Sequence, residues 1–274
     1  YISISRILRN IVLSIFSIFL GLFFYKAIFI IISHIISLVI INSLLIYIIF
    51  KKNILEKNLF NYKKTFILLK KYFHFPLYSL PSAFINILSN QAPIIMLSIY
   101  FGSSVSGMYS LVNRAMGAPS KLISSATSEV FRQKAAEEYK LNNNCKNLYL
   151  STFKGLLLIS FLPFSVTIFF GPELFSFFFG DPWLQAGYYA RYLSIFYMLR
   201  FCISPLGFTL IISNRQDYNL YWQITLLLVS NIGLFIGYYY SNVTYSIIAF
   251  SVFYSIMYLF YFKESYKSSK GILS

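Results

Sequence analysis

Eight apolar segments recur from one end of this sequence to the other, and most are long enough to cross a bilayer. At about 1.5 Å of rise per residue, a helix of about 20 residues spans a hydrocarbon core of about 30 Å. Charged residues make up only 11% of the 274 residues, too few to cover a water-soluble domain of this size. The sequence therefore predicts an all-α, polytopic membrane protein. The segments are 10–25, 28–50, 76–101, 107–131, 154–171, 186–212, 218–238 and 244–262.

The basic residues between these segments set the predicted orientation, because short loops rich in Lys and Arg stay in the cytoplasm. If the chain starts in the cytoplasm and the segments alternate, the inner loops contain 18 of the 23 Lys and Arg residues, and the outer loops contain only Lys26. Both ends are therefore expected in the cytoplasm. The net charge of +15 is divided among these loops instead of forming one patch, so it indicates topology and not nucleic-acid binding.

The loop 51–75 combines basic residues with a helical apolar pattern. This pattern is typical of an amphipathic helix lying on the cytoplasmic membrane surface. A plain basic tether between spans is the alternative, but the periodicity favours a linker that joins two helical lobes. The apolar residues at steps of three or four are Leu55, Leu59, Tyr62, Phe66, Leu69 and Phe73.

The sequence contains none of the patterns expected of a soluble active site. It has no G-x-x-x-x-G-K-[ST] run for nucleotide phosphates. His34 and His74 have no Cys or carboxylate at metal-ligand spacing, and Cys145 and Cys202 do not form a disulfide framework. Glu129 is the only carboxylate at membrane depth, which argues against paired catalytic carboxylates. We therefore predict no cofactor and no metal, and a protein that is not an enzyme.

One stripe of polar and basic residues follows the segment 107–132. Arg114, Lys121, Ser125, Ser128 and Arg132 are spaced 7, 4, 3 and 4 apart, which places them on one face of an α-helix. Each charge facing lipid would cost on the order of 2.5–3.5 kcal/mol. The stripe is therefore predicted to line an aqueous cavity that binds an anionic substrate, such as a phosphate or diphosphate.

A structural role for this stripe is the alternative interpretation. Lys121 could extend to the interface, Arg132 could sit at the cytoplasmic edge, and Glu129 could pair with either. Arg114 provides the strongest argument for a cavity. Pro119 is expected to kink or break the helix, which is tolerated where a helix lines a cavity.

Three further groups of polar residues fall inside predicted spans. Arg200 lies near mid-depth and is assigned to the cavity as a second substrate contact. Arg191 lies near the outer boundary, where lipid headgroups, Glu173 or Asp181 could bind it. The cluster Asn86, Asn90 and Gln91 shares one face of segment 76–101. Asn90 is counted among the candidate substrate contacts, with interhelical hydrogen bonding as the alternative.

The stretch 75–218 resembles the polysaccharide flippases, the O-antigen or Wzx-type translocases. These belong to the multidrug/oligosaccharidyl-lipid/polysaccharide exporter superfamily. The order and spacing of the shared features support the resemblance, and no single motif does. The features are Pro76, Tyr100-Phe101-Gly102, Gly107-x-Tyr109, Arg114, Pro119, Val130-Phe131, Phe179-Gly180, Trp183, Ala186, Tyr189, Pro205 and Asn214-Arg215.

The resemblance implies about twelve helices in two six-helix lobes. Residues 1–50 would then be the last two helices of the N-terminal lobe. Residues 51–75 would be the basic cytoplasmic linker, and 76–274 the C-terminal lobe. The first residue is Tyr1 and not Met, so we expect the chain to be the C-terminal portion of a longer protein. The implied location is the bacterial inner membrane.

The resemblance also implies the substrate and the direction of transport. An undecaprenyl-diphosphate-linked oligosaccharide would move from the cytoplasmic to the outer leaflet by alternating access through a central cationic cavity. Implied partners are this lipid-linked oligosaccharide, membrane lipids, a polysaccharide polymerase and a chain-length regulator. Three alternatives stay open, one of them a structural subunit that only scaffolds a synthesis complex. A multidrug exporter should carry acidic cavity residues, and an O-antigen polymerase or other polysaccharide-synthesis enzyme should carry a long outer loop.

Overall fold

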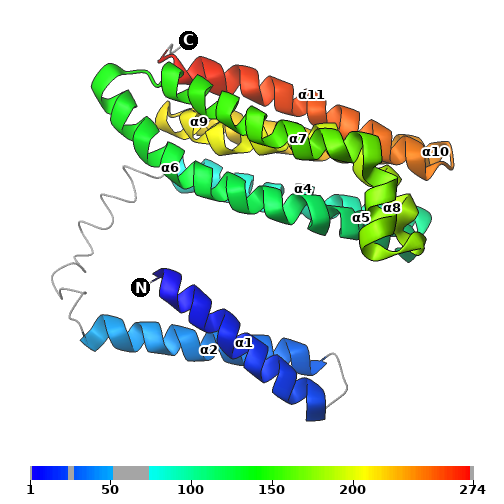
Figure 1. Ribbon diagram of the computed structural model, residues 1–274. Helices are drawn as coiled ribbons and strands as arrows, with labels where there is room; N and C mark the ends of the chain where they lie inside the picture. Colours follow the sequence, from blue (N-terminus) through cyan, green and yellow to red (C-terminus); the bar gives the residue numbers. More distant parts are fainter. Residues whose placement is uncertain (1, 24–27, 52–73, 272–274) are drawn as a thin grey trace. The chain divides into compact units, whose positions relative to one another are not determined.

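The computed structural model describes residues 2–23, 28–51 and 74–271 (Figure 1). Every regular element in these ranges is helical, which confirms the predicted all-α class. Five apolar stretches of the described chain are long enough to span a membrane, so the protein is a multi-pass membrane protein. The chain divides into two compact units, Tyr1–Lys71 and Tyr72–Ser274, called unit 1 and unit 2 below. The five stretches are Leu77–Phe101, Lys146–Phe179, Asp181–Ile212, Gln216–Tyr239 and Val243–Ser269.

Unit 1 consists of two apolar helices that pack on each other, α1 (Ile2–Phe23) and α2 (Ile28–Lys51). Ser17 Oγ and Ser33 Oγ lie 2.8 Å apart across this contact. Small hydroxyl side chains are typical of helix contacts in lipid, because they allow close approach and satisfy each other. The shorter apolar cores of the two helices are Ile11–Leu20 and Ile31–Ile46.

Unit 2 is a bundle of longer helices joined by short helical turns. The long helices are α4 (His74–Phe101), α5 (Ser103–Val112), α6 (Ala118–Asn142), α7 (Lys146–Phe179), α8 (Leu184–Ile203), α10 (Gln216–Tyr239) and α11 (Val243–Ser269). The short elements are the π turn η2 (Asn113–Gly117), the 3-10 turns η3 (Asp181–Trp183) and η4 (Ser204–Gly207), and α9 (Phe208–Ile212).

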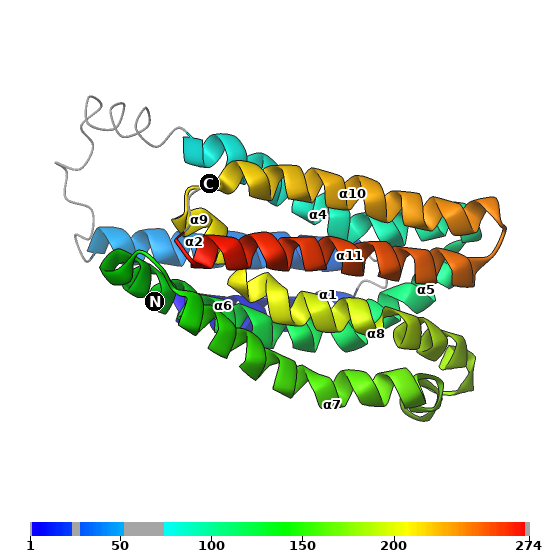
Figure 2. The same ribbon diagram turned by 90° about the horizontal axis from the view of Figure 1, so that it is seen from above.

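Five of the long helices close into a ring. The neighbours in order are α4, α5, α8, α11 and α10, and α10 returns to α4. Helix α7 packs outside this ring against α8, as Figure 2 shows. Glycines allow α7 and α8 to come closest to each other. A Cβ on Gly187 would overlap the backbone of Pro172 and lie 2.5 Å from the carbonyl oxygen of Gly171.

The two ends of unit 2 differ in charge. At one end the α6–α7 turn meets the end of α11, where Cys145 N–H donates to the Ser269 carbonyl (2.8 Å) and Arg215 pairs with Glu264 (2.9 Å). At the other end Tyr100 stacks on Tyr238 at 4.5 Å between ring centres. Basic residues gather at the first end, which is therefore the end that the positive-inside rule predicts to be cytoplasmic. They are Arg132, Lys134, Lys140, Lys146, Lys154, Arg215, Lys263, Lys267 and Lys270.

Several predicted boundaries were wrong. The segment 107–131 is part of one helical stretch, 103–142, that α5, the π turn and α6 form together, and it is not among the apolar spans. Segment 154–171 is part of a longer helix, α7, because the chain stays helical through Pro172 with a kink at Phe170. Most of the predicted outer loop 172–185 is therefore helical.

Two predictions about organisation remain predictions. The amphipathic linker 51–75 falls almost entirely on residues 52–73, which lie outside the described residues. The assignment of 1–50 and 76–274 to two lobes, and the cytoplasmic location of both chain ends, are likewise expectations.

Candidate functional site

A chain of polar side chains crosses the interior of the helix ring. Arg200 Nη2 on α8 donates to Asn90 Oδ1 on α4 at 2.5 Å. Asn90 Nδ2 donates in turn to the carbonyl (2.7 Å) and Oδ1 (3.1 Å) of Asn86. Asn86 Nδ2 donates to Gln223 Oε1 on α10 at 3.2 Å. We call Asn86, Asn90, Arg200 and Gln223 the polar centre; Gln223 is buried and the other three are half-buried.

Helical spacing explains why these residues meet. Asn86 and Asn90 are four residues apart, so they project from the same face of α4. Phe196 and Arg200 share a face of α8 in the same way, and the guanidinium lies 5.9 Å from the Phe196 ring centre. The interhelical hydrogen bonding considered for the asparagines is therefore present, whereas Gln91 is exposed.

Four buried tyrosines lie close enough to Arg200 to interact with it electrostatically. Their exposed fractions are only 2–5%. Tyr254 and Tyr258 lie one turn apart on α11 with stacked rings 5.5 Å apart. Within the described ranges, no carboxylate forms an ion pair with Arg200. The four residues are Tyr109, Tyr197, Tyr254 and Tyr258.

The π turn connects this interior to the surface. Pro119 has no N–H to donate and its ring crowds the carbonyl four residues earlier, so the helix widens into a π turn just before it. Within the turn, Asn113 Oδ1 accepts from the Tyr197 hydroxyl at 3.0 Å. Gly117 leaves room for this contact, because a Cβ there would lie 2.8 Å from Asn113 Oδ1.

The predicted stripe lies on the outside of unit 2. Arg114, Lys121 and Ser125 are exposed, and Ser128 is half-buried. Ser125 Oγ donates to the carbonyl of Leu122 (2.9 Å), as hydroxyls on helices often do. We call Arg114, Lys121, Ser125 and Ser128 the cationic face.

The π turn changes the alignment within the cationic face. One additional residue in a turn rotates everything after it by about 100° relative to an unbroken α-helix. Arg114 lies inside the π turn and Lys121 in α6, so the regular α-helical spacing from which the stripe was inferred does not hold between them. Neither side chain has an ion pair or hydrogen bond with a described residue.

The structure therefore separates the predicted site residues into two groups. Arg200 and Asn90 are in direct contact inside the ring, whereas the cationic face is exposed. Arg132 continues down the same helix, with its guanidinium 5.0 Å from the Phe208 ring centre. Arg191 pairs with Glu173 at 3.9 Å, one of the partners expected for it.

Sequence reasoning missed Gln223, Asn113 and the tyrosines of α11. A signal was available for Gln223, a lone amide in an apolar span, since such groups seek a partner in a neighbouring helix. The spacing of Tyr254 and Tyr258 also indicated a shared face. Their role depends on Arg200, which only the tertiary packing brings near them.

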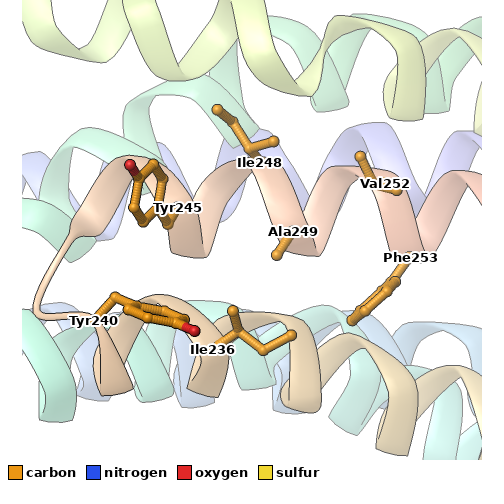
Figure 3. Close-up of a pocket in the computed structure, with 7 residues that line it drawn as sticks. All are labelled: Ile236, Tyr240, Tyr245, Ile248, Ala249, Val252 and Phe253. Carbon is orange, nitrogen blue, oxygen red and sulfur yellow. The ribbon is translucent and has the colours of Figure 1, made fainter.

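A concave surface lies at the α10–α11 hairpin. It has a volume of about 380 Å³ and is lined by side chains of both helices and the turn between them (Figure 3). No charged residue lines it, so it offers no contact for a phosphate group. The lining residues are Ile236, Tyr240, Tyr245, Ile248, Ala249, Val252 and Phe253.

Comparison with known proteins adds two findings. Residues 1–187 match a family described as polysaccharide biosynthesis protein. The chain is also similar to the teichuronic acid biosynthesis protein TuaB of Bacillus subtilis (strain 168), with 26% identity over 167 residues. That match covers 61% of this chain but only 35% of the relative, so the chain spans about a third of its length. No solved structure matches.

Proposed function

Because the chain belongs to the family of polysaccharide biosynthesis proteins and is a multi-pass membrane protein, we propose that it moves a lipid-linked oligosaccharide across the membrane. The substrate of this proposal is an undecaprenyl-diphosphate-linked repeat unit. It travels from the cytoplasmic to the outer leaflet of the bacterial inner membrane. The protein acts as a transporter and not as an enzyme.

The observation that carries the proposal is the exposed, unpaired charge of the cationic face. Arg114 and Lys121 stand on a helix that is too polar to count among the apolar spans. Such charges are costly in contact with lipid and favourable in an aqueous cavity. Arg and Lys are the side chains that best bind diphosphate oxygens.

Each part of the substrate has a suitable environment in this arrangement. The diphosphate binds the cationic face, the sugars occupy the water-filled cavity, and the polyprenyl chain stays in lipid. Rocking of two helical lobes about this site would expose it first to one side of the membrane and then to the other. A polysaccharide polymerase and a chain-length regulator are the partners expected to receive the product.

The test is complementation with the full-length gene in a strain that lacks its own flippase. Arg114→Gln and Lys121→Gln should each reduce surface polysaccharide, and lipid-linked repeat units should accumulate in the cytoplasmic leaflet. Lys134→Gln is the matched control, because Lys134 is an exposed lysine further along the same helix. All variants are compared at equal membrane abundance.

The side on which the intermediate accumulates separates the alternatives. Single repeat units trapped on the outer leaflet would indicate a polymerase defect and contradict transport. Unchanged polysaccharide with both Arg114→Gln and Lys121→Gln would remove the role assigned to the cationic face. Drug sensitivity with normal polysaccharide would indicate a multidrug exporter.

A further inference from the structure

The concave surface at the α10–α11 hairpin, called the hairpin groove below, has a closed floor. Gly237 lets the two helices come close, since a Cβ there would lie 2.1 Å from the backbone nitrogen of Ser246. Ala249 lies between the helices and presents only a methyl group, whereas Ile248 and Val252 beside it are exposed (Figure 3). The close backbone contact and the small side chain of Ala249 leave a hollow of about 380 Å³.

The hairpin groove is formed by two membrane-spanning helices, so its solvent is hydrocarbon. Both α10 and α11 are long and apolar enough to cross a bilayer. No Asp, Glu, Lys or Arg occurs between Asp217 and Lys263, a stretch that contains every residue of the groove. A hollow of this volume with a wholly apolar lining fits an apolar ligand and offers nothing to a polar solute.

The length of the hairpin groove matches one leaflet of the membrane. Tyr240 and Tyr245 lie at the end next to the turn, and Phe253 lies at the other end (Figure 3). Eight residues of α11 lead from Tyr245 to Phe253, which is about 12 Å of helix. Half of a hydrocarbon core is about 15 Å thick. An acyl chain that enters beside the tyrosines can therefore contact the groove over most of its depth.

The tyrosine end of the hairpin groove suits the polar part of a phospholipid. It lies at the end of unit 2 where Tyr100 stacks on Tyr238, and such aromatic clusters are typical of the membrane interface. The hydroxyls of Tyr240 and Tyr245 make no hydrogen bond with any described residue, and these side chains are 64% and 54% exposed. They can donate to the ester carbonyls of a lipid. No cation is present there to bind a diphosphate, so a polyprenyl diphosphate fits less well.

We propose that the hairpin groove binds one acyl chain of a phospholipid from the leaflet at the tyrosine end, with Tyr240 and Tyr245 beside the ester groups. The groove belongs to helices other than the one that carries the cationic face. Helix α6 packs on α7, α8 and α9, whereas α10 packs mostly on α4 and α11. The lipid is thus a resident of the protein and not its cargo, and the proposal does not rest on the proposed transport function.

The test is photolabelling of the full-length protein in detergent with a phosphatidylethanolamine whose acyl chain carries a diazirine. We expect labelling that saturates, that is concentrated on residues 245–253 and that unlabelled phosphatidylethanolamine prevents. Ala249→Phe fills the groove and should lower the labelling about tenfold, which corresponds to about 1.4 kcal/mol. Leu259→Phe is the matched control, because Leu259 is an exposed residue of the same helix outside the groove, and it should leave the labelling unchanged.

Three results would overturn the proposal. Labelling spread evenly over exposed apolar residues, including Leu158 and Leu162 of α7, would indicate general contact with hydrocarbon and no site. Stronger competition by undecaprenyl diphosphate than by phosphatidylethanolamine would assign the groove to an isoprenoid chain. Wild-type labelling of an Ala249→Phe protein that unfolds at the wild-type temperature would place the acyl chain elsewhere. The position and saturation of the label in the wild type decide the question if Ala249→Phe does not accumulate.

Discussion

The hydrogen bond between Arg200 and Asn90 is predicted to be a main stabilising contact of unit 2. Asn90→Leu keeps a side chain of similar size and removes the acceptor of this bond. Hydrogen bonds to charged groups contribute about 1.5–3 kcal/mol, while neutral ones between membrane helices average about 0.6 kcal/mol. Because the donor is a guanidinium, we expect a loss of about 2 kcal/mol. That corresponds to a change of about 30-fold in the unfolding equilibrium.

Asn231→Leu provides the matched control. The Asn231 amide donates only to the carbonyl of Leu227 in its own helix, at 2.6 Å, and its Oδ1 is buried without a partner among the described residues. Replacing it therefore removes an unsatisfied polar atom, and its effect should lie within about 0.5 kcal/mol of zero or be stabilising.

The assay is equilibrium unfolding of the purified protein in mixed detergent micelles. A double-mutant cycle with Arg200→Met isolates the energy of the pair from other effects of each change. We expect a coupling of more than about 1 kcal/mol. Equal destabilisation by Asn90→Leu and Asn231→Leu, or additive effects in the cycle, would refute the importance assigned to this contact.

Three further predictions concern packing, reactivity and charge. Gly187→Leu should destabilise the protein by about 3 kcal/mol in a thermal-unfolding assay, or prevent its accumulation, because a Cβ there overlaps the backbone of α7. Gly155→Leu is the control and should be tolerated in the same assay, because nothing lies within 4 Å of a Cβ at that position. Burial, together with a nearby glutamate, raises the pKa of the Cys145 thiol to about 11. The test is maleimide labelling of Cys145 in a Cys202→Ser background, measured by mass spectrometry. At pH 8 the labelling rate should be about 100-fold lower than that of a free thiol, and it should rise with pH up to about 11. Arg215 and Glu264 are partly exposed, so a double-mutant cycle on their ion pair should give a coupling of only about 0.5–1 kcal/mol that decreases in high salt.

Hydropathy alone was sufficient to predict most of the fold. The spans in α4, α7, α8, α10 and α11 coincide with predicted apolar segments, because lipid selects long apolar helices whatever their neighbours are. Helix ends were less predictable. Pro172 suggested the end of a span, yet α7 continues to Phe179, since a kink at Phe170 accommodates the missing backbone donor.

Two members of the polar centre stood out in the sequence, but their contact did not. Arg200 and Asn90 were each conspicuous, because charged and amide side chains are rare inside spans. Their contact depends on α4 and α8 both bordering the same ring interior, which no local pattern encodes. The tyrosines of α11 resembled ordinary apolar aromatics. They became significant only because the packing brings them near Arg200, a cation on another helix.

The π turn shows how a local rule can alter a prediction made from spacing. Seven residues separate Arg114 from Lys121, which in a regular α-helix aligns them. Pro119 disfavours that regularity, and the π turn before it contains both Arg114 and Asn113, whose Oδ1 accepts a hydrogen bond from Tyr197. Consecutive residues of one turn thus serve the exposed cationic face and the interior of the ring. Because Arg114 and Asn113 are neighbours in this turn, regularising the helix is expected to shift Arg114 and to break the contact of Asn113 with Tyr197 together.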